Sequence, residues 1–181
     1  MADLYVSWSE YHQQIEQLAA QIYRSGWSFN QIICLARGGL RVGDLLSRIY
    51  QQPLAILATA SYGGTKGQDR HQLTVGQEIT MTTENLGNRI LLVDDLVDSG
   101  ITLEQTLIWL QQRYGSGIED LRTAVLWYKA CSRIKPHFYV DYLPENPWIH
   151  QPFESYEKTD IEALSQTYAA IDLSAPRASC N

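Results

Sequence analysis

The residues best suited to chemistry stand in one short stretch that combines carboxylates, small residues and hydroxyls. Asp94 and Asp95 follow the apolar run Ile90–Val93, and after two apolar residues come Asp98, Ser99, Gly100 and Thr102. Backbone amides at a helix start bind anions, glycine lets the backbone approach a ligand closely, and hydroxyls add donors. Carboxylates beside such a site suit a ligand that presents hydroxyls or a magnesium ion together with a phosphate.

The elements that must hold this stretch are a strand before it and a helix after it. Ile90–Val93 is too short for a typical helix and is rich in branched side chains, which predicts a buried strand. Leu103, Leu107 and Leu110 then follow at helical spacing. A plain strand-to-helix turn with an aspartate cap is the alternative, and it explains one aspartate but not three. The stretch also lacks the lysine of a P-loop.

A second loop of the same kind follows Gln31–Ala36, whose apolar composition predicts another buried strand. Arg37, Gly38 and Gly39 come next, ahead of a helical pattern. Two glycines allow backbone amides to face a ligand, and an arginine fork suits a phosphate. Taken alone, the loop is equally well explained as a turn with a surface arginine. Together with the acidic stretch, it predicts a phosphate-binding site.

Both loops match a known family. Val93–Thr102 resembles the phosphoribosyl-pyrophosphate (PRPP) loop of the type I phosphoribosyltransferases. The resemblance implies an α/β fold with a mostly parallel central sheet flanked by helices, a small hood and a flexible lid loop. It implies that Asp98 is the general base, and that the 5′-phosphate of PRPP binds at Asp98, Ser99, Gly100, Ile101 and Thr102. Arg37 and Gly38 resemble the pyrophosphate-binding loop, which typically contains a non-proline cis peptide.

The segment Trp148–Glu154 and the preceding Lys129 resemble the base-binding hood of the bacterial xanthine-guanine and archaeal hypoxanthine-guanine phosphoribosyltransferases. The resemblance implies that Trp148 stacks on a purine and that the backbone near Ile149 meets its position-2 edge. Lys129 would donate to the oxygen at position 6 and select oxopurines over adenine. The alternative for Trp148 is a core aromatic residue. A magnesium ion is implied as the cofactor, with Asp95, Asp94 and Glu154 as its candidate ligands.

Residues 61–84 are expected to form the lid. The part up to Arg70 is glycine-rich and polar, without a helical or strand period, and an exposed hairpin tip is the alternative. Arg70 is the candidate to bind pyrophosphate from the lid, with Tyr62 and Lys66 as further possibilities, and Leu73–Thr83 is the expected returning strand.

The remaining elements complete an alternation of strands and helices. A capping-box pattern at Ser7–Glu10 predicts a first helix that ends near Gly26, and Asp120–Tyr128 predicts a strand. Alternating strands and helices imply a mostly parallel sheet, with ligands at the carboxyl ends of its strands. We expect one domain over residues 1–173, with its hood at about 130–156, a packed terminal helix at Asp160–Ile171, and a tail of possible disorder at 174–181. Prolines and aromatic residues predict an irregular but packed segment at residues 135–154 of the hood.

Composition narrows the classes of function. The 181 residues carry a net charge of −6, which argues against binding a nucleic-acid backbone through bulk charge. No apolar run is long enough for a membrane span, and three widely spaced cysteines indicate reduced thiols in the cytoplasm.

The expected function is therefore transfer of a phosphoribosyl group from PRPP to a 6-oxopurine by a homodimer or homotetramer. Two alternatives remain: a PRPP-binding regulatory protein without turnover, and a transferase for another base. The sequence does not rank hypoxanthine, guanine and xanthine.

Overall fold

A seven-stranded sheet forms the centre of the molecule in a computed structural model that describes residues 3–62 and 72–169. The strand order is β4-β3-β2-β5-β7-β6, and β8 pairs with the other side of β7. All of the strand pairs are parallel except β3–β4. The strands are β2 (Gln31–Ala36), β3 (Leu54–Tyr62), β4 (Gln72–Val75), β5 (Arg89–Val93), β6 (Leu96–Val97), β7 (Asp120–Lys129) and β8 (Phe138–Leu143).

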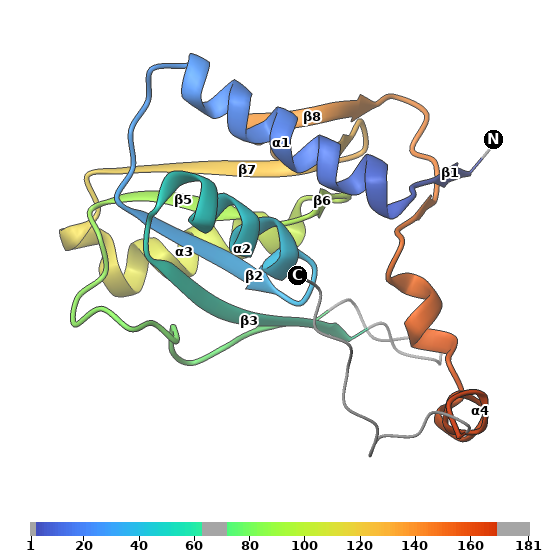
Figure 1. The fold of residues 1–181 in the computed structure, drawn as a ribbon. Coiled ribbons are helices and arrows are strands. Elements are labelled where there is room, and N and C mark those ends of the chain that lie inside the picture. Colours follow the sequence, from blue (N-terminus) through green and yellow to red (C-terminus); the bar gives the residue numbers. More distant parts are fainter. Residues whose placement is uncertain (1–2, 63–71, 170–181) are drawn as a thin grey trace, which may run out of the picture.

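Helices cover both faces of this sheet (Figure 1). One core cluster packs α1 (Trp8–Arg24) and α2 (Gly39–Tyr50) against the sheet, and a second cluster includes buried residues of α3 (Ile101–Tyr114). Buried side chains alternate between the two faces along β2, where Ile32 belongs to the first cluster and Ile33 to the second. This arrangement confirms the predicted α/β fold with a mostly parallel sheet.

The first helix begins where the sequence predicts. Ser7 Oγ accepts from the backbone amide of Glu10 at 3.2 Å, and Glu10 Oε2 accepts from the amide of Ser7 at 2.8 Å. This reciprocal pair is a capping box, which satisfies amides that a helix start leaves free. The helix ends at Arg24 with Ser25 as its C-cap, and Gly26 then takes a left-handed conformation with φ of +71°.

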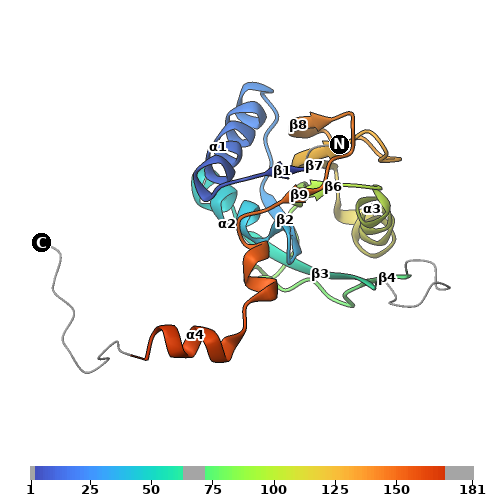
Figure 2. The same cartoon turned by 90° about the vertical axis from the view of Figure 1, so that its right-hand side faces the viewer.

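A second, two-stranded parallel sheet joins the N-terminus to the expected hood. β1 (Leu4–Tyr5) pairs with β9 (Ile149–His150), with Leu4 opposite Ile149 and Tyr5 opposite His150. The short 3₁₀ helix η2 (Glu154–Lys158) follows β9 and leads to α4 (Ile161–Thr167). Figure 2 shows β1 and β9 beside the carboxyl ends of the main strands.

Three local expectations differ from the structure. Residues 138–143, expected to be an irregular part of the hood, form β8 at the edge of the main sheet. The predicted strand over residues 73–83 reaches only Val75, with one further bridge between Ile56 and Thr80. The terminal helix does form at Ile161–Thr167, but none of its residues is buried, and it lies apart from the sheet (Figures 1 and 2), so the prediction that it packs was wrong.

Several expectations fall on residues 63–71 and 170–181, outside the described part of the chain; they include Lys66, Arg70, Cys180 and the tail at 174–181. Of the other cysteines, Cys34 is buried and Cys131 is exposed, and both are free thiols. Among the described residues, no helix combines the length and the apolar character that crossing a membrane requires.

Candidate functional site

The predicted site residues follow the ends of parallel strands. Arg37 follows β2, Asp94 follows β5 and Asp98 follows β6, while Lys129 is the last residue of β7. Because parallel strands end at one edge of a sheet, their terminal residues gather there. The structure thus brings the two loops to the same edge, as the sequence predicts.

Asp94 and Asp95 interrupt what would otherwise be one strand along β7. β5 pairs with residues up to Ala124 and β6 with Trp127 and Tyr128, so the two acids fall at the break. The carbonyl oxygen of Asp95 accepts from the amides of both Leu126 and Trp127, at 2.9 and 3.2 Å. This local irregularity keeps both acids at the edge of the sheet.

Asp94 is half-buried, as Asp95 is, and its Oδ1 accepts from the amide of Asp95 at 3.0 Å. Its burial, and then the negative charge of Asp95, raise the pKa of the Asp94 carboxyl well above its usual value. Amides of Asp95 and Gly39 that donate to the carboxyl oppose this shift only in part. An ionised Asp94 therefore lowers the stability of the folded protein.

We expect Asp94→Asn to raise the thermal stability of the free protein near neutral pH, by roughly 1–2 kcal/mol. An acid whose pKa is raised by folding binds its proton more tightly in the folded state. Wild-type stability therefore decreases as pH rises from the unfolded value, about 3.9, through the raised folded value. Thermal unfolding across this range should show no gain for the variant at about pH 3 and an increasing gain above it. A gain that is equal at every pH would contradict this account.

The loop after β2 lies against Asp95. A cis peptide joins Ala36 to Arg37, as the resemblance implied. A Cβ atom added at Gly38 would overlap the Asp95 carboxylate, and one added at Gly39 would overlap the Val93 carbonyl oxygen, so the two glycines let the loops approach this closely. The Arg37 guanidinium is largely exposed, and its Nη2 lies 3.4 Å from Glu157 Oε1.

The turn into α3 has the geometry of an anion site. Gly100 caps the helix with φ of +80°, and as a glycine it has no side chain that could accept from the first-turn amides. The Ile101 amide donates a long hydrogen bond to Ser99 Oγ, with 3.4 Å between nitrogen and oxygen. A Cβ atom at Gly100 would overlap Ser132 Oγ, so a residue with a side chain would not fit at this position without a shift of Ser132. Asp98 and Ser99 are exposed beside these amides.

Lys129 and Asp98 form an ion pair with unequal exposure. Lys129 Nζ lies 3.5 Å from Asp98 Oδ1, with the lysine side chain 7% exposed and the aspartate side chain 57% exposed. The Cys131 thiol also donates to Asp98 Oδ1, at 3.4 Å. Slight desolvation of the thiol, and then its hydrogen bond to Asp98, raise the pKa of Cys131, so it keeps its proton. The edge thus presents a buried cation beside an accessible carboxylate.

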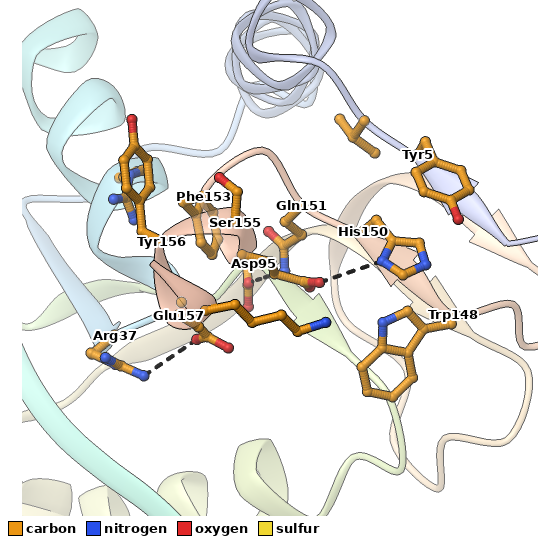
Figure 3. A pocket seen from close by; sticks show the side chains of 15 residues that line it. Tyr5, Arg37, Asp95, Trp148, His150, Gln151, Phe153, Ser155, Tyr156 and Glu157 are labelled. Atoms are coloured by element: carbon orange, nitrogen blue, oxygen red, sulfur yellow. Dashed lines mark hydrogen bonds and ion pairs between the residues drawn. The ribbon is translucent and has the colours of Figure 1, made fainter. Parts of the chain in front are cut away.

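A cavity of about 960 Å³ opens between this edge and the hood. Figure 3 shows Arg37 and Trp148 at its two ends, with Asp95 between them. Of the predicted site residues, its lining contains Arg37, Gly38, Asp95, Trp148 and Glu154. The lining does not include Asp94, Asp98, Ser99, Gly100, Ile101, Thr102, Lys129 or Ile149.

Trp148 is not a core residue. Its side chain is 62% exposed at the cavity, while the neighbouring Ile149 is buried at 4% exposure. The Trp148 carbonyl accepts from the Leu4 amide at 2.8 Å, so pairing between β1 and β9 holds the hood backbone. A large exposed aromatic face in a cavity is available to stack on a planar ligand.

Sequence reasoning missed several residues of the cavity. Arg41 follows Arg37 by one helical turn, and its guanidinium carbon lies 4.4 Å from the centre of the Phe153 ring. Gln151 donates to Asp95, and His150 stacks on Tyr5 with ring centres 4.3 Å apart. The spacing of Arg41 and the place of Gln151 in the Trp148–Glu154 motif were the available signals. Glu157 carried no such signal.

The candidate metal ligands are only partly assembled. Asp95 and Glu154 both line the cavity, and Glu154 Oε2 lies 3.7 Å from His150 Nδ1. Among the described residues, no group of three or more potential ligands converges on one point. Magnesium commonly binds through one or two carboxylates plus the phosphates of a substrate, and the oxygens of Asp95 fit that pattern.

The family model for the phosphoribosyl transferase domain matches residues 7–158. The chain therefore belongs to the phosphoribosyl transferase domain family. Within that family it has the type I fold, and it is a pentosyltransferase, which confirms the resemblance seen in the two loops.

Individual relatives agree with this placement. The chain is 28% identical over 155 residues to a xanthine-guanine phosphoribosyltransferase of Idiomarina loihiensis, covering 85% of this chain and 88% of the relative. It is 23% identical over 161 residues to a protein of the same name from Nitratidesulfovibrio vulgaris, covering 89% and 90%. A solved purine phosphoribosyltransferase from Pyrococcus horikoshii aligns with a TM-score of 0.68 and 26% identity, covering 84% of this chain and 95% of that one.

Proposed function

We propose that the protein transfers the 5-phosphoribosyl group of PRPP to N9 of a 6-oxopurine, which gives a nucleoside monophosphate and pyrophosphate. The purine class is supported by the similarity to xanthine-guanine and purine phosphoribosyltransferases. The observation that carries the choice of base is the pair formed by Lys129 and Asp98.

This pair matches one edge of a 6-oxopurine. O6 and N7 of guanine lie side by side and are read together by paired polar groups. Lys129 Nζ, a donor, stands 3.5 Å from Asp98 Oδ1, an acceptor. The donor would meet O6 while the acceptor takes or shares the proton at N7. Adenine presents an amino group at position 6, which would face the ammonium group of Lys129 with a donor rather than an acceptor.

PRPP would lie along the edge of the sheet. Its 5′-phosphate would bind the open turn at Asp98, Ser99, Gly100, Ile101 and Thr102, where free amides and the helix dipole favour an anion. Arg37 and Gly38 would bind the departing pyrophosphate at one end of the cavity, and Trp148 would stack on the base at the other. This order places the ribose near Asp95. Arg70 stays a prediction for the same pyrophosphate.

Magnesium is proposed as the cofactor, with Asp95, Asp94 and Glu154 as candidate ligands. When bound with PRPP, the metal supplies positive charge for the leaving pyrophosphate. The chain itself would contribute the Arg37 guanidinium to the same charge, and the Asp95 carboxylate would orient the ribose hydroxyls or the waters of the metal. Assembly as a homodimer or homotetramer and a cytoplasmic location stay predictions.

A turnover assay tests the proposal. PRPP consumption is measured with hypoxanthine, guanine, xanthine, adenine and uracil, in the presence of magnesium. We expect turnover with at least one of the first three and much slower turnover with adenine and uracil. Turnover confined to adenine or uracil would contradict the assigned base, and PRPP binding without any turnover would favour a regulatory protein.

We also expect Glu157→Gln to tighten PRPP binding modestly, up to about fivefold. In the free protein the Glu157 carboxylate forms an ion pair with the Arg37 guanidinium. A bound pyrophosphate group would have to break this ion pair. Exposed ion pairs typically contribute about 0–1 kcal/mol, which sets this upper bound. Calorimetric titration with PRPP at low and high salt measures the effect, which should shrink as salt screens the pair. Glu162→Gln removes the same charge from α4, outside the cavity lining, and is expected to leave binding unchanged.

A further inference from the structure

Gln151 connects the hood to the acidic loop. It directly follows β9, and its Nε2 donates to Asp95 Oδ2 at 2.5 Å, joining segments 56 residues apart in the chain. Both side chains line the cavity and point toward one another (Figure 3). This hydrogen bond attaches a side chain of the Trp148–Glu154 segment directly to an acid of the PRPP loop.

We propose that Gln151 is a positioning residue, which holds the Asp95 carboxylate in the orientation that binds PRPP and its metal. The proposal rests on the function proposed above and extends it to a residue of the hood. Gln151 acts through Asp95 and takes no part in bond formation.

The surroundings of Asp95 explain why a neutral donor suits this place. The Asp95 carboxylate fills the space where a Cβ atom of residue 38 would stand, and the main-chain oxygen of Asp95 accepts from two amides of β7. Gln151 donates to Oδ2, and this hydrogen bond orients the carboxylate within that space. An amide donor orients the carboxylate without cancelling its charge, whereas a lysine or arginine would compete with the metal.

The rest of the Gln151 side chain argues against a purely stabilising role. Its Oε1 atom is buried and has no hydrogen-bond partner among the described residues. A buried polar atom left without a partner costs about 1–3 kcal/mol, which offsets the gain from the bond to Asp95. An apolar side chain of similar size should therefore support folding about as well as glutamine does.

The chain offers a matched control. Gln14 Nε2 donates to Asp141 Oδ2 at 2.7 Å, and its Oε1 is likewise buried without a partner among the described residues. Gln14 belongs to α1 and its partner Asp141 to β8, and neither residue lines the cavity. Gln14→Met thus removes the same kind of hydrogen bond without touching the proposed site.

The experiment compares Gln151→Met with Gln14→Met, using full-length protein in magnesium. We expect Gln151→Met to raise the PRPP dissociation constant, measured by calorimetry, and the KM for PRPP by about 10–100-fold, as loss of a supporting partner typically does. The KM for the purine and the unfolding temperature should change little, and Gln14→Met should match wild type in both binding measurements. Gln151→Glu keeps the size of the side chain but sets a carboxylate against Asp95, so it should lose at least as much PRPP affinity as Gln151→Met.

A double-mutant cycle establishes whether Gln151 acts through Asp95. In an Asp95→Ala background, Gln151→Met should cause almost no further loss of PRPP affinity, because its target is gone. Additive losses, PRPP binding by Gln151→Met equal to that of wild type, or near-normal binding by Gln151→Glu would each overturn the positioning role. A wild-type protein that neither binds PRPP nor turns over any base would overturn the proposed function first, and this inference with it.

Discussion

Asp98→Asn should lower kcat by about 10²–10⁴-fold while PRPP binding survives, since general-base catalysis typically contributes that much. Asparagine keeps the size of the side chain and an oxygen that accepts from Lys129 and from the Cys131 thiol. It cannot take a proton at neutral pH. The backbone amides at the start of α3 are untouched, so the affinity for the 5′-phosphate should stay close to that of wild type. Steady-state turnover with guanine and calorimetric titration with PRPP separate the two effects.

The control for this variant lies six residues further along the chain, in the first turn of α3. Glu104 in α3 pairs with Arg133 at 3.5 Å, the same separation as that between Asp98 and Lys129. Glu104→Gln makes the same change of charge and is expected to leave kcat within about twofold of wild type, as for an exposed pair. If Asp98→Asn also stayed within a few-fold of wild type, Asp98 would not be the general base.

Local patterns predicted the strand-loop-helix units because each unit is encoded in a short segment. The acids at Asp94 and Asp95, the glycine at position 100 and the two glycines after Arg37 all stand where the structure uses them. Their convergence followed from the rule that ligands bind at the carboxyl ends of parallel strands. Contacts between distant segments carried no such pattern, which is why the bonds of Gln151 to Asp95 and of Glu157 to Arg37 appeared only in the structure.

The wrong local expectations also have physical reasons. Prolines suggested an irregular segment near residues 135–154, but Pro136 precedes β8 and Pro144 follows it, where proline disturbs no hydrogen bond within the ladder. For the terminal helix, the predicted element forms, but the predicted packing against the rest of the protein does not. Helical spacing of Ile161, Leu164 and Tyr168 indicates an amphipathic helix, but it does not say what covers its apolar face.

Lys129→Met should reduce kcat/KM for 6-oxopurines by about 10–100-fold, because a hydrogen bond to a charged group typically contributes about 1.5–3 kcal/mol. The oxygen at position 6 would face a methyl group in place of an ammonium donor. The slow reaction of adenine should not decrease, since its amino group gains nothing from Lys129. The ratio of guanine to adenine turnover should therefore fall. Competition assays with both bases in one reaction measure this ratio directly.

Because the two partners of the ion pair are unequally buried, Lys129→Met tests base selection with little loss of stability. Removing Lys129 leaves Asp98, whose side chain is 57% exposed and stays hydrated, so the fold should tolerate the change. Removing the charge of Asp98 instead leaves the lysine, 7% exposed, without its counter-charge, and should cost more stability. Lys135→Met removes an exposed lysine that lies over Tyr139, and should keep the base preference of wild type. An unchanged guanine-to-adenine ratio in Lys129→Met would remove Lys129 from base selection, and with it the match between the Lys129–Asp98 pair and a 6-oxopurine.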